Sequence, residues 1–66
     1  MIIKDFTEPE LEYLRKNCHF VGDEIELFEM RSTGIPLEII AEHLNLSVDG
    51  VKKISRKVNR KIIKVL

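Results

Sequence analysis

The chain has 66 residues, close to the lower limit at which a polypeptide folds without disulfides or metals, so we expect one domain, residues 1–66, and no elaborate catalytic pocket. The hydrophobic share of 44% and the charged share of 33%, with only three glycines and two prolines, argue against a disordered chain. The formal net charge is zero, but residues 1–46 hold four Lys or Arg against ten Asp or Glu, whereas residues 47–66 hold seven against Asp49 alone. A polyanion responds to the local patch within a Debye length of about 8–10 Å, so the basic end should face the partner.

The first helix is predicted to begin at the segment Thr7-Glu8-Pro9-Glu10. The Thr7 hydroxyl can cap the first free amides, Pro9 is tolerated in a first turn, and Glu10 can reach back as in a capping box. Leu11 and Leu14 then form the apolar edge of this helix, with Tyr13 at its margin.

The second helix is predicted from Asp23 to Arg31, with an acidic start that suits the positive end of the helix dipole. Its apolar face is formed by Ile25 or Leu27, together with Phe28 and Met30. The sequence Ser32-Thr33-Gly34 is expected to end it.

The third helix is predicted to start near Pro36, because proline is accepted in a first helical turn, and to run to Leu44. Asn45 should end it in a left-handed conformation, and Ser47 should cap a fourth helix of about 18 residues. The apolar positions of that helix follow the three-four spacing of one buried stripe: Val51, Ile54, Val58, Ile62 and Val65. No stretch alternates like a strand, so the predicted fold class is all-α, with four short helices and no sheet.

The segment IIAEHLNLSVDGVKKI has the features of a helix-turn-helix at the required distances. Ala41 is small where the two helices would cross, Asn45 stands in the turn four residues later, and Val51 packs the second helix onto the first. The remaining apolar positions of the motif are Ile40, Leu44, Leu46 and Ile54. The alternative is a plain helical hairpin in a small bundle, which would not need the basic residues of the outward face.

This segment resembles the LuxR/GerE-type tetrahelical helix-turn-helix domains and the related region-four domain of bacterial sigma factors, which reads promoter DNA. The resemblance covers about residues 20–62, FVGDEIELFEMRSTGIPLEIIAEHLNLSVDGVKKISRKVNRKI. It implies a trihelical core over residues 20–66 without a wing, with residues 1–19 as an amino-terminal arm and an added helix. The sequence departs from the family at Val21-Gly22 and Ile35-Pro36, where a Ser or Thr cap is usual, and at Gly50, where Thr or Arg is usual.

The resemblance implies sequence-specific binding of double-stranded DNA by a stand-alone bacterial or phage transcription regulator, with the basic last helix in the major groove. Matched by position, the base-facing residues would be Val48, Asp49, Lys52, Lys53 and Arg56. The residues expected at backbone phosphates are Ser47, Lys57, Arg60 and Lys61. Lysine or arginine suits guanine, aspartate suits the cytosine amine and valine suits the thymine methyl.

Some apolar residues exceed what the four-helix stripe requires: Ile2, Ile3, Phe6, Leu37, Ile39, Ile63 and Leu66. Either the amino-terminal arm folds back over them, or they form a homodimer interface through the last helix or the arm. A sigma-like monomer would instead dock on RNA polymerase. The alternative function is a protein-interaction module, an anti-regulator or polymerase-associated adaptor, that would bind through Leu37, Ile39 and the arm without contacting DNA.

We expect no enzyme, no metal and no cofactor, because the sequence has no glycine-rich phosphate loop and no paired metal-ligand spacing. Cys18, the single cysteine, lies beside His19 and is more typical of a packing residue in a reducing compartment than of a nucleophile. No segment approaches the roughly 20 apolar residues that cross a bilayer, and the start of the chain lacks leader features. A cytoplasmic location without a membrane partner is therefore expected.

Overall fold

Four α-helices form the chain in the computed structural model, which describes residues 3–66 apart from the side chain of Lys4. After a 3₁₀ turn, η1 (Ile3–Asp5), they are α1 (Glu8–Asn17), α2 (Asp23–Ser32), α3 (Leu37–Leu44) and α4 (Val48–Val65). The described residues include no strand, so the predicted all-α class is confirmed. None of the helices among them is long and apolar enough to cross a membrane.

The helix ends lie where local signals in the sequence place them. At the start of α1 the Glu10 carboxylate accepts the backbone amide of Thr7 at 2.7 Å, which is one half of the predicted capping box. Asn45 ends α3 in the left-handed region at φ 59°, and Ser47 accepts the amide of Gly50 at 3.1 Å to cap α4. The fourth helix has the predicted 18 residues.

Two glycines occupy positions that restrict the side chain. Gly22 precedes α2 at φ 55°, in a region that residues with a Cβ rarely adopt, so a serine or threonine cap would be strained there. A Cβ on Gly50 would lie 3.3 Å from the Ser47 hydroxyl oxygen, a tight contact with the capping group. At the third helix, Pro36 is the capping residue itself and helical geometry begins at Leu37.

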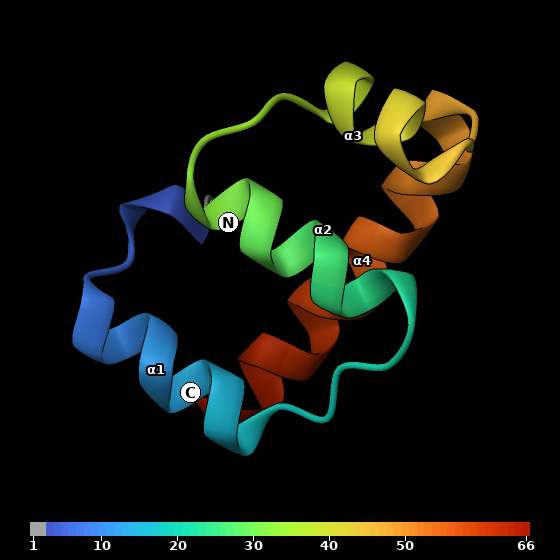
Figure 1. Ribbon diagram of the computed structural model, residues 1–66. Helices are drawn as coiled ribbons and strands as arrows, with labels where there is room; N and C mark the ends of the chain where they lie inside the picture. Colours follow the sequence, from blue (N-terminus) through green and yellow to red (C-terminus); the bar gives the residue numbers. More distant parts are fainter. Residues whose placement is uncertain (1–2) are drawn as a thin grey trace.

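The long helix α4 is the element around which the others are arranged, since it contacts each of the other three α-helices (Figure 1). The helix α3 lies at its beginning, and α1 lies at its end, where the Tyr13 hydroxyl donates to the Val65 carbonyl at 3.2 Å. The predicted stripe of α4 faces inward, with Val51, Val58 and Ile62 fully buried. The outer positions of the stripe, Ile54 and Val65, are half-buried against the same core.

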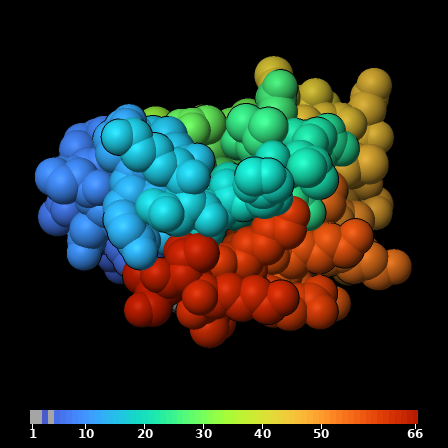
Figure 2. Space-filling model, turned by 90° about the horizontal axis from the view of Figure 1, so that it is seen from below, coloured from blue at the N-terminus to red at the C-terminus, as the bar shows by residue number. Residues whose placement is uncertain are grey.

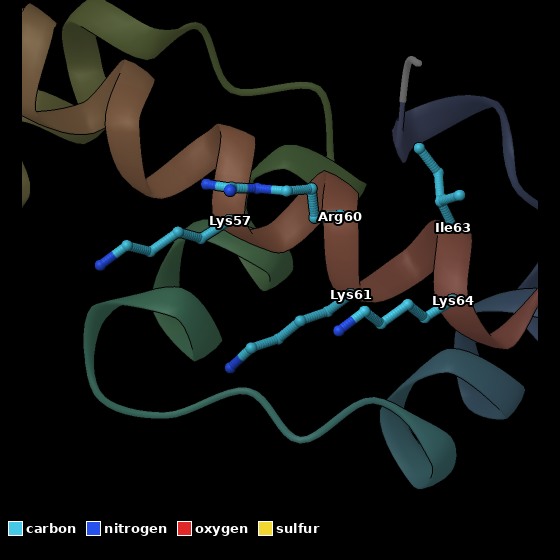
Figure 3. Close-up of a pocket in the computed structure, with 5 residues that line it drawn as sticks. All are labelled: Lys57, Arg60, Lys61, Ile63 and Lys64. Carbon is cyan, nitrogen blue, oxygen red and sulfur yellow. The ribbon is translucent and has the colours of Figure 1, made fainter.

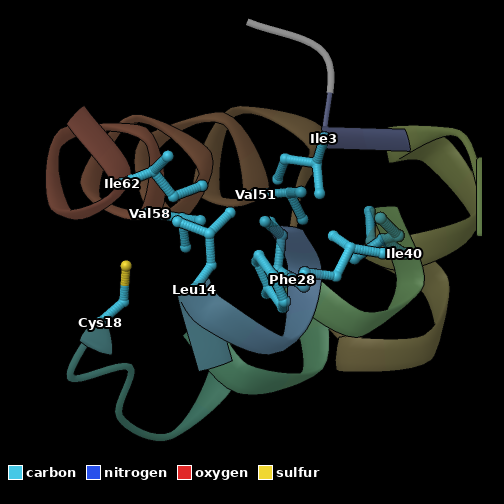
Figure 4. Close-up of a cluster of buried hydrophobic side chains, with 11 residues drawn as sticks. Ile3, Leu14, Cys18, Phe28, Ile40, Val51, Val58 and Ile62 are labelled. Atoms are coloured by element: carbon cyan, nitrogen blue, oxygen red, sulfur yellow. The ribbon is translucent and has the colours of Figure 1, made fainter. Parts of the chain in front are cut away.

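A single hydrophobic core draws side chains from every element (Figure 4). Its largest fully buried members are Phe28, Leu14, Leu27, Ile40, Ile62, Val51 and Val58. Ala41, expected where two helices cross, is only 5% exposed. Because contributions come from η1 and α1 as well as from α2 to α4, the amino-terminal segment belongs to the same core as the rest.

Three expectations about apolar residues are resolved by packing. On α2, Leu27 is buried and Ile25 is 49% exposed, so the first of the two alternatives was wrong. Leu46, assigned to the apolar set of the motif, is 37% exposed, because it lies in the connection that leaves α3. The arm folds back as one alternative required, with Ile3 buried and Phe6 packed against the core, but it does not cover Ile39, Ile63 and Leu66, which remain exposed. Ile2 lies outside the described residues.

Candidate nucleic-acid interface

The outward face of α4 carries most of the positive charge of the chain. Six cations of this helix are exposed: Lys52, Lys53, Arg56, Lys57, Arg60 and Lys64. Within residues 3–66, none of the six forms an ion pair with a carboxylate. Figure 2 shows α4, in orange and red, along one side of the molecule, with its surface open to solvent. The basic charge expected from the sequence is therefore available to a partner.

The predicted base-facing residues gather on one sector of this face. At about 100° per residue, Lys52, Lys53 and Arg56 fall within an arc of about 100°, opposite the buried Val51. Asp49 is also exposed and falls within the same arc. Val48 differs because it is half-buried and packs against the core, so only part of its side chain can face a ligand.

The length of the cationic face exceeds the width of one DNA groove. From Asp49 to Arg56 the helix advances about 10 Å, which fits within a major groove about 12 Å wide. From Lys52 to Lys64 it advances about 18 Å. The first half of α4 can therefore enter a groove while Arg60 and Lys64 lie beyond its edge.

Lys61 does not belong to the free cationic face, although the sequence placed it among the phosphate contacts. Its ammonium group donates to the Glu24 carboxylate at 2.5 Å and to the His19 carbonyl at 2.6 Å. The same carboxylate oxygen of Glu24 accepts the backbone amide of Val21 at 3.1 Å. Lys61 thus fastens the connection between α1 and α2 to the long helix, and its charge is satisfied within the protein.

The electrostatic environment of this clamp agrees with its geometry. Glu24 is only 8% exposed, and the hydrogen bond from Lys61 lowers the pKa of its carboxyl group despite the opposing effect of burial. Next to the clamp, burial raises the pKa of the Cys18 thiol, which lies 3.6 Å from the Lys61 carbonyl oxygen. Cys18 is therefore the packing residue that the sequence indicated. Glu24 was not predicted from the sequence as a functional or structural partner of Lys61. The available signal was the position of Lys61 next to the buried Ile62, at the edge of the apolar stripe of α4.

A shallow hollow of about 500 Å³ lies on the second half of α4. It is lined by Lys57, Arg60, Lys61, Ile63 and Lys64 (Figure 3). The three lysines extend from one side of the helix and Ile63 from another, and Ile63 is 62% exposed. The hollow thus combines an exposed apolar side chain with three cations that have no carboxylate partner among the described residues, Lys57, Arg60 and Lys64.

No protein-family model, curated protein or solved structure matches this chain. The candidate interface is an exposed row of cations on α4. The buried apolar stripe of α4 and the short turn after α3 hold this helix in place.

Proposed function

We propose that this protein binds double-stranded DNA in a sequence-specific manner, with the first half of α4 in the major groove. The observation that carries the proposal is the row of six exposed cations on α4, none of which has a carboxylate partner among the described residues. Unpaired cations repel one another, and a polyanion that neutralises them releases its own counterions. A duplex is the ligand whose charge and groove width suit this helix.

The proposal interprets α3, the turn and α4 as a helix-turn-helix. Three features support this interpretation: the left-handed Asn45 in the turn, the small buried Ala41 on α3 and the fully buried Val51 on α4. The resemblance of residues 20–62 to LuxR/GerE-type and sigma region-four domains points the same way. On this basis the protein is a transcription regulator of bacterial or phage type.

Within the proposed complex, Lys52, Lys53 and Arg56 donate to base edges in the major groove, where guanine presents two acceptors. Asp49 accepts from a cytosine amine and repels phosphate, which favours specificity over affinity. The backbone contacts fall to Ser47, Lys57 and Arg60, at the start and in the middle of the helix. Lys61 is left out of this set because Glu24 already holds its ammonium group.

The salt dependence of binding follows from the number of phosphates that the domain neutralises. With two phosphates neutralised, by Lys57 and Arg60, the logarithm of the binding constant should fall with a slope of about −1.8 against the logarithm of salt concentration. Raising the salt from 50 to 200 mM would then weaken binding about 12-fold.

The proposal is tested by fluorescence anisotropy of the protein on a labelled random duplex across that salt range. Replacing Lys52, Lys53 and Arg56 together by alanine should strongly weaken the binding and leave the thermal unfolding curve unchanged, because all three side chains are exposed. The binding that remains should keep the salt dependence due to Lys57 and Arg60. A matched pair separates specific placement from net charge, with Lys53→Ala on α4 against Lys16→Ala on α1. Absence of binding at 50 mM salt, or equal effects of the two single variants, would contradict the proposal.

A second candidate function, a protein-interaction module, is favoured by one observation on α3. Ile39 is 48% exposed and stands between Glu38 and Glu42, which are also exposed. The other apolar residues assigned to this function are less available, since Leu37 is half-buried and Ile3 is 3% exposed. If the duplex does not bind at low salt, this surface of α3 becomes the site to examine.

A further inference from the structure

The surface of α3 and the hollow on α4 each combine one exposed isoleucine with two flanking charged side chains, and the charges have opposite signs. On α3, the exposed Ile39 is flanked by the carboxylates of Glu38 and Glu42. On α4, the exposed Ile63 is flanked by the cations of Arg60 and Lys64. Within the described residues, none of these four charged side chains forms an ion pair. We propose that the Glu38-Ile39-Glu42 surface of one copy docks into the α4 hollow of a second copy.

The acidic surface of α3 differs from the other acidic helices because its two carboxylates, Glu38 and Glu42, have no ion-pair partner among the described residues. Two other exposed apolar residues occur on acidic helices, but their surroundings are already occupied. Beside Ile25 on α2, Glu29 holds Arg15 at 2.8 Å and Glu26 lies 3.1 Å from His43.

On α1, the hydroxyl group of Tyr13 is bonded to Val65, and the neighbouring Glu12 pairs with Arg15 at 2.8 Å. The α3 surface therefore presents an exposed apolar side chain between two carboxylates that no cation of the described residues neutralises.

The contact cannot form within one chain. The helix α3 lies beside the beginning of α4 (Figure 1), whereas Ile63 comes 15 residues after the first residue of α4, or about 22 Å further along its axis. A contact between unlike surfaces of two copies is heterologous and repeats head to tail. The alternative, a two-fold dimer through the same hollow, would place Arg60 and Lys64 near their own symmetry mates, and like charges disfavour it.

The zero net charge of the whole chain permits this association, because copies without net charge do not repel one another at a distance. The attraction between the two surfaces should depend on salt. The Debye length falls from about 30 Å at 0.01 M to about 3 Å at 1 M ionic strength, so exposed charge pairs are screened at the upper value. We therefore expect a weak, reversible association at low salt and a monomer at high salt.

Sedimentation equilibrium of the full chain without DNA tests the contact. At low salt and millimolar concentration, the weight-average mass should rise above 7.7 kDa, and at 1 M salt it should return to that value. Two variants each remove one surface: Glu38→Gln with Glu42→Gln, and Arg60→Gln with Lys64→Gln. Each should remain monomeric alone, and an equimolar mixture should form only a one-to-one pair, because one intact interface remains between them.

The matched control is Lys52→Gln with Lys53→Gln, which changes the net charge as much as the variant of the hollow but leaves the hollow intact. This control should still associate at low salt, whereas the Arg60→Gln, Lys64→Gln variant should remain monomeric. All substituted residues are exposed, and thermal unfolding monitors that every variant stays folded. A wild-type chain that is monomeric at low salt, or either surface variant associating like the wild type, would overturn the proposal. Since no DNA is present, failure here leaves the proposed DNA binding unaffected.

Discussion

Replacing Lys61 by methionine removes the ammonium group that joins α4 to the connection between α1 and α2, while keeping a side chain of similar length. The Glu24 carboxylate, 8% exposed, would then retain only the Val21 amide as a partner. Removing one member of a buried ion pair costs about 3–5 kcal/mol. The Lys61 side chain is 33% exposed, so screening by water reduces this figure and we expect a loss of about 2–3 kcal/mol.

A loss of this size should lower the melting temperature of a 66-residue domain by about 10–20 °C. Circular dichroism melts of Lys61→Met, Glu24→Gln and the double variant form a double-mutant cycle, in which we expect a coupling free energy of about 1–2 kcal/mol. Lys64→Met on the exposed side of the same helix is the control, with a loss under about 0.5 kcal/mol. Additive single effects would show that the two side chains do not act as a pair.

The pH dependence provides a second measurement of the same contact. Because the Lys61 ammonium lowers the pKa of Glu24 in the folded state, the folded protein binds fewer protons than the unfolded chain around that pKa. The stabilisation is therefore present above the unfolded value of about 4.3 and is lost as pH falls through the lower, folded value. The coupling free energy should be full at pH 7 and absent below both values; a coupling independent of pH would refute an ionic origin.

Two further predictions concern the turn between α3 and α4. Ser47→Ala removes the acceptor of the Gly50 amide, so a chemical denaturation curve should show a loss of about 1 kcal/mol; an unchanged midpoint would show that water replaces the cap. Asn45 stands at φ 59°, where glycine is unstrained and a Cβ costs about 1–2 kcal/mol. Asn45→Ala should therefore unfold at a lower denaturant concentration than Asn45→Gly, and the reverse order would contradict the left-handed assignment.

The helix ends could be predicted from the sequence because their causes are local. The Glu10 carboxylate bonds a residue three positions away, and Ser47 does the same for α4. The left-handed Asn45 depends on its own backbone. Such signals operate within one helical turn, so a short stretch of sequence contains all the information that they need.

The side chains that the sequence placed wrongly depend on distant partners. Ile25 and Leu27 are two residues apart, and only the packing of α2 against α4 and η1 decides which of them is buried. Lys61 and Glu24 are separated by 37 residues. A lysine that the sequence assigned to a DNA phosphate therefore pairs with a carboxylate of the protein itself. The charge segregation was visible from the sequence, but which cations remain free required the fold.

The two proposed partners of α4 share Arg60, so they would compete for the second half of this helix. A duplex carries one negative charge per about 1.7 Å of its length and releases counterions on binding, whereas the α3 surface offers only the two carboxylates of Glu38 and Glu42. Low salt strengthens both contacts, but DNA also engages Lys52, Lys53 and Arg56, which the second copy leaves free. A duplex should therefore displace the second copy, so the self-associated form is expected only in the absence of DNA.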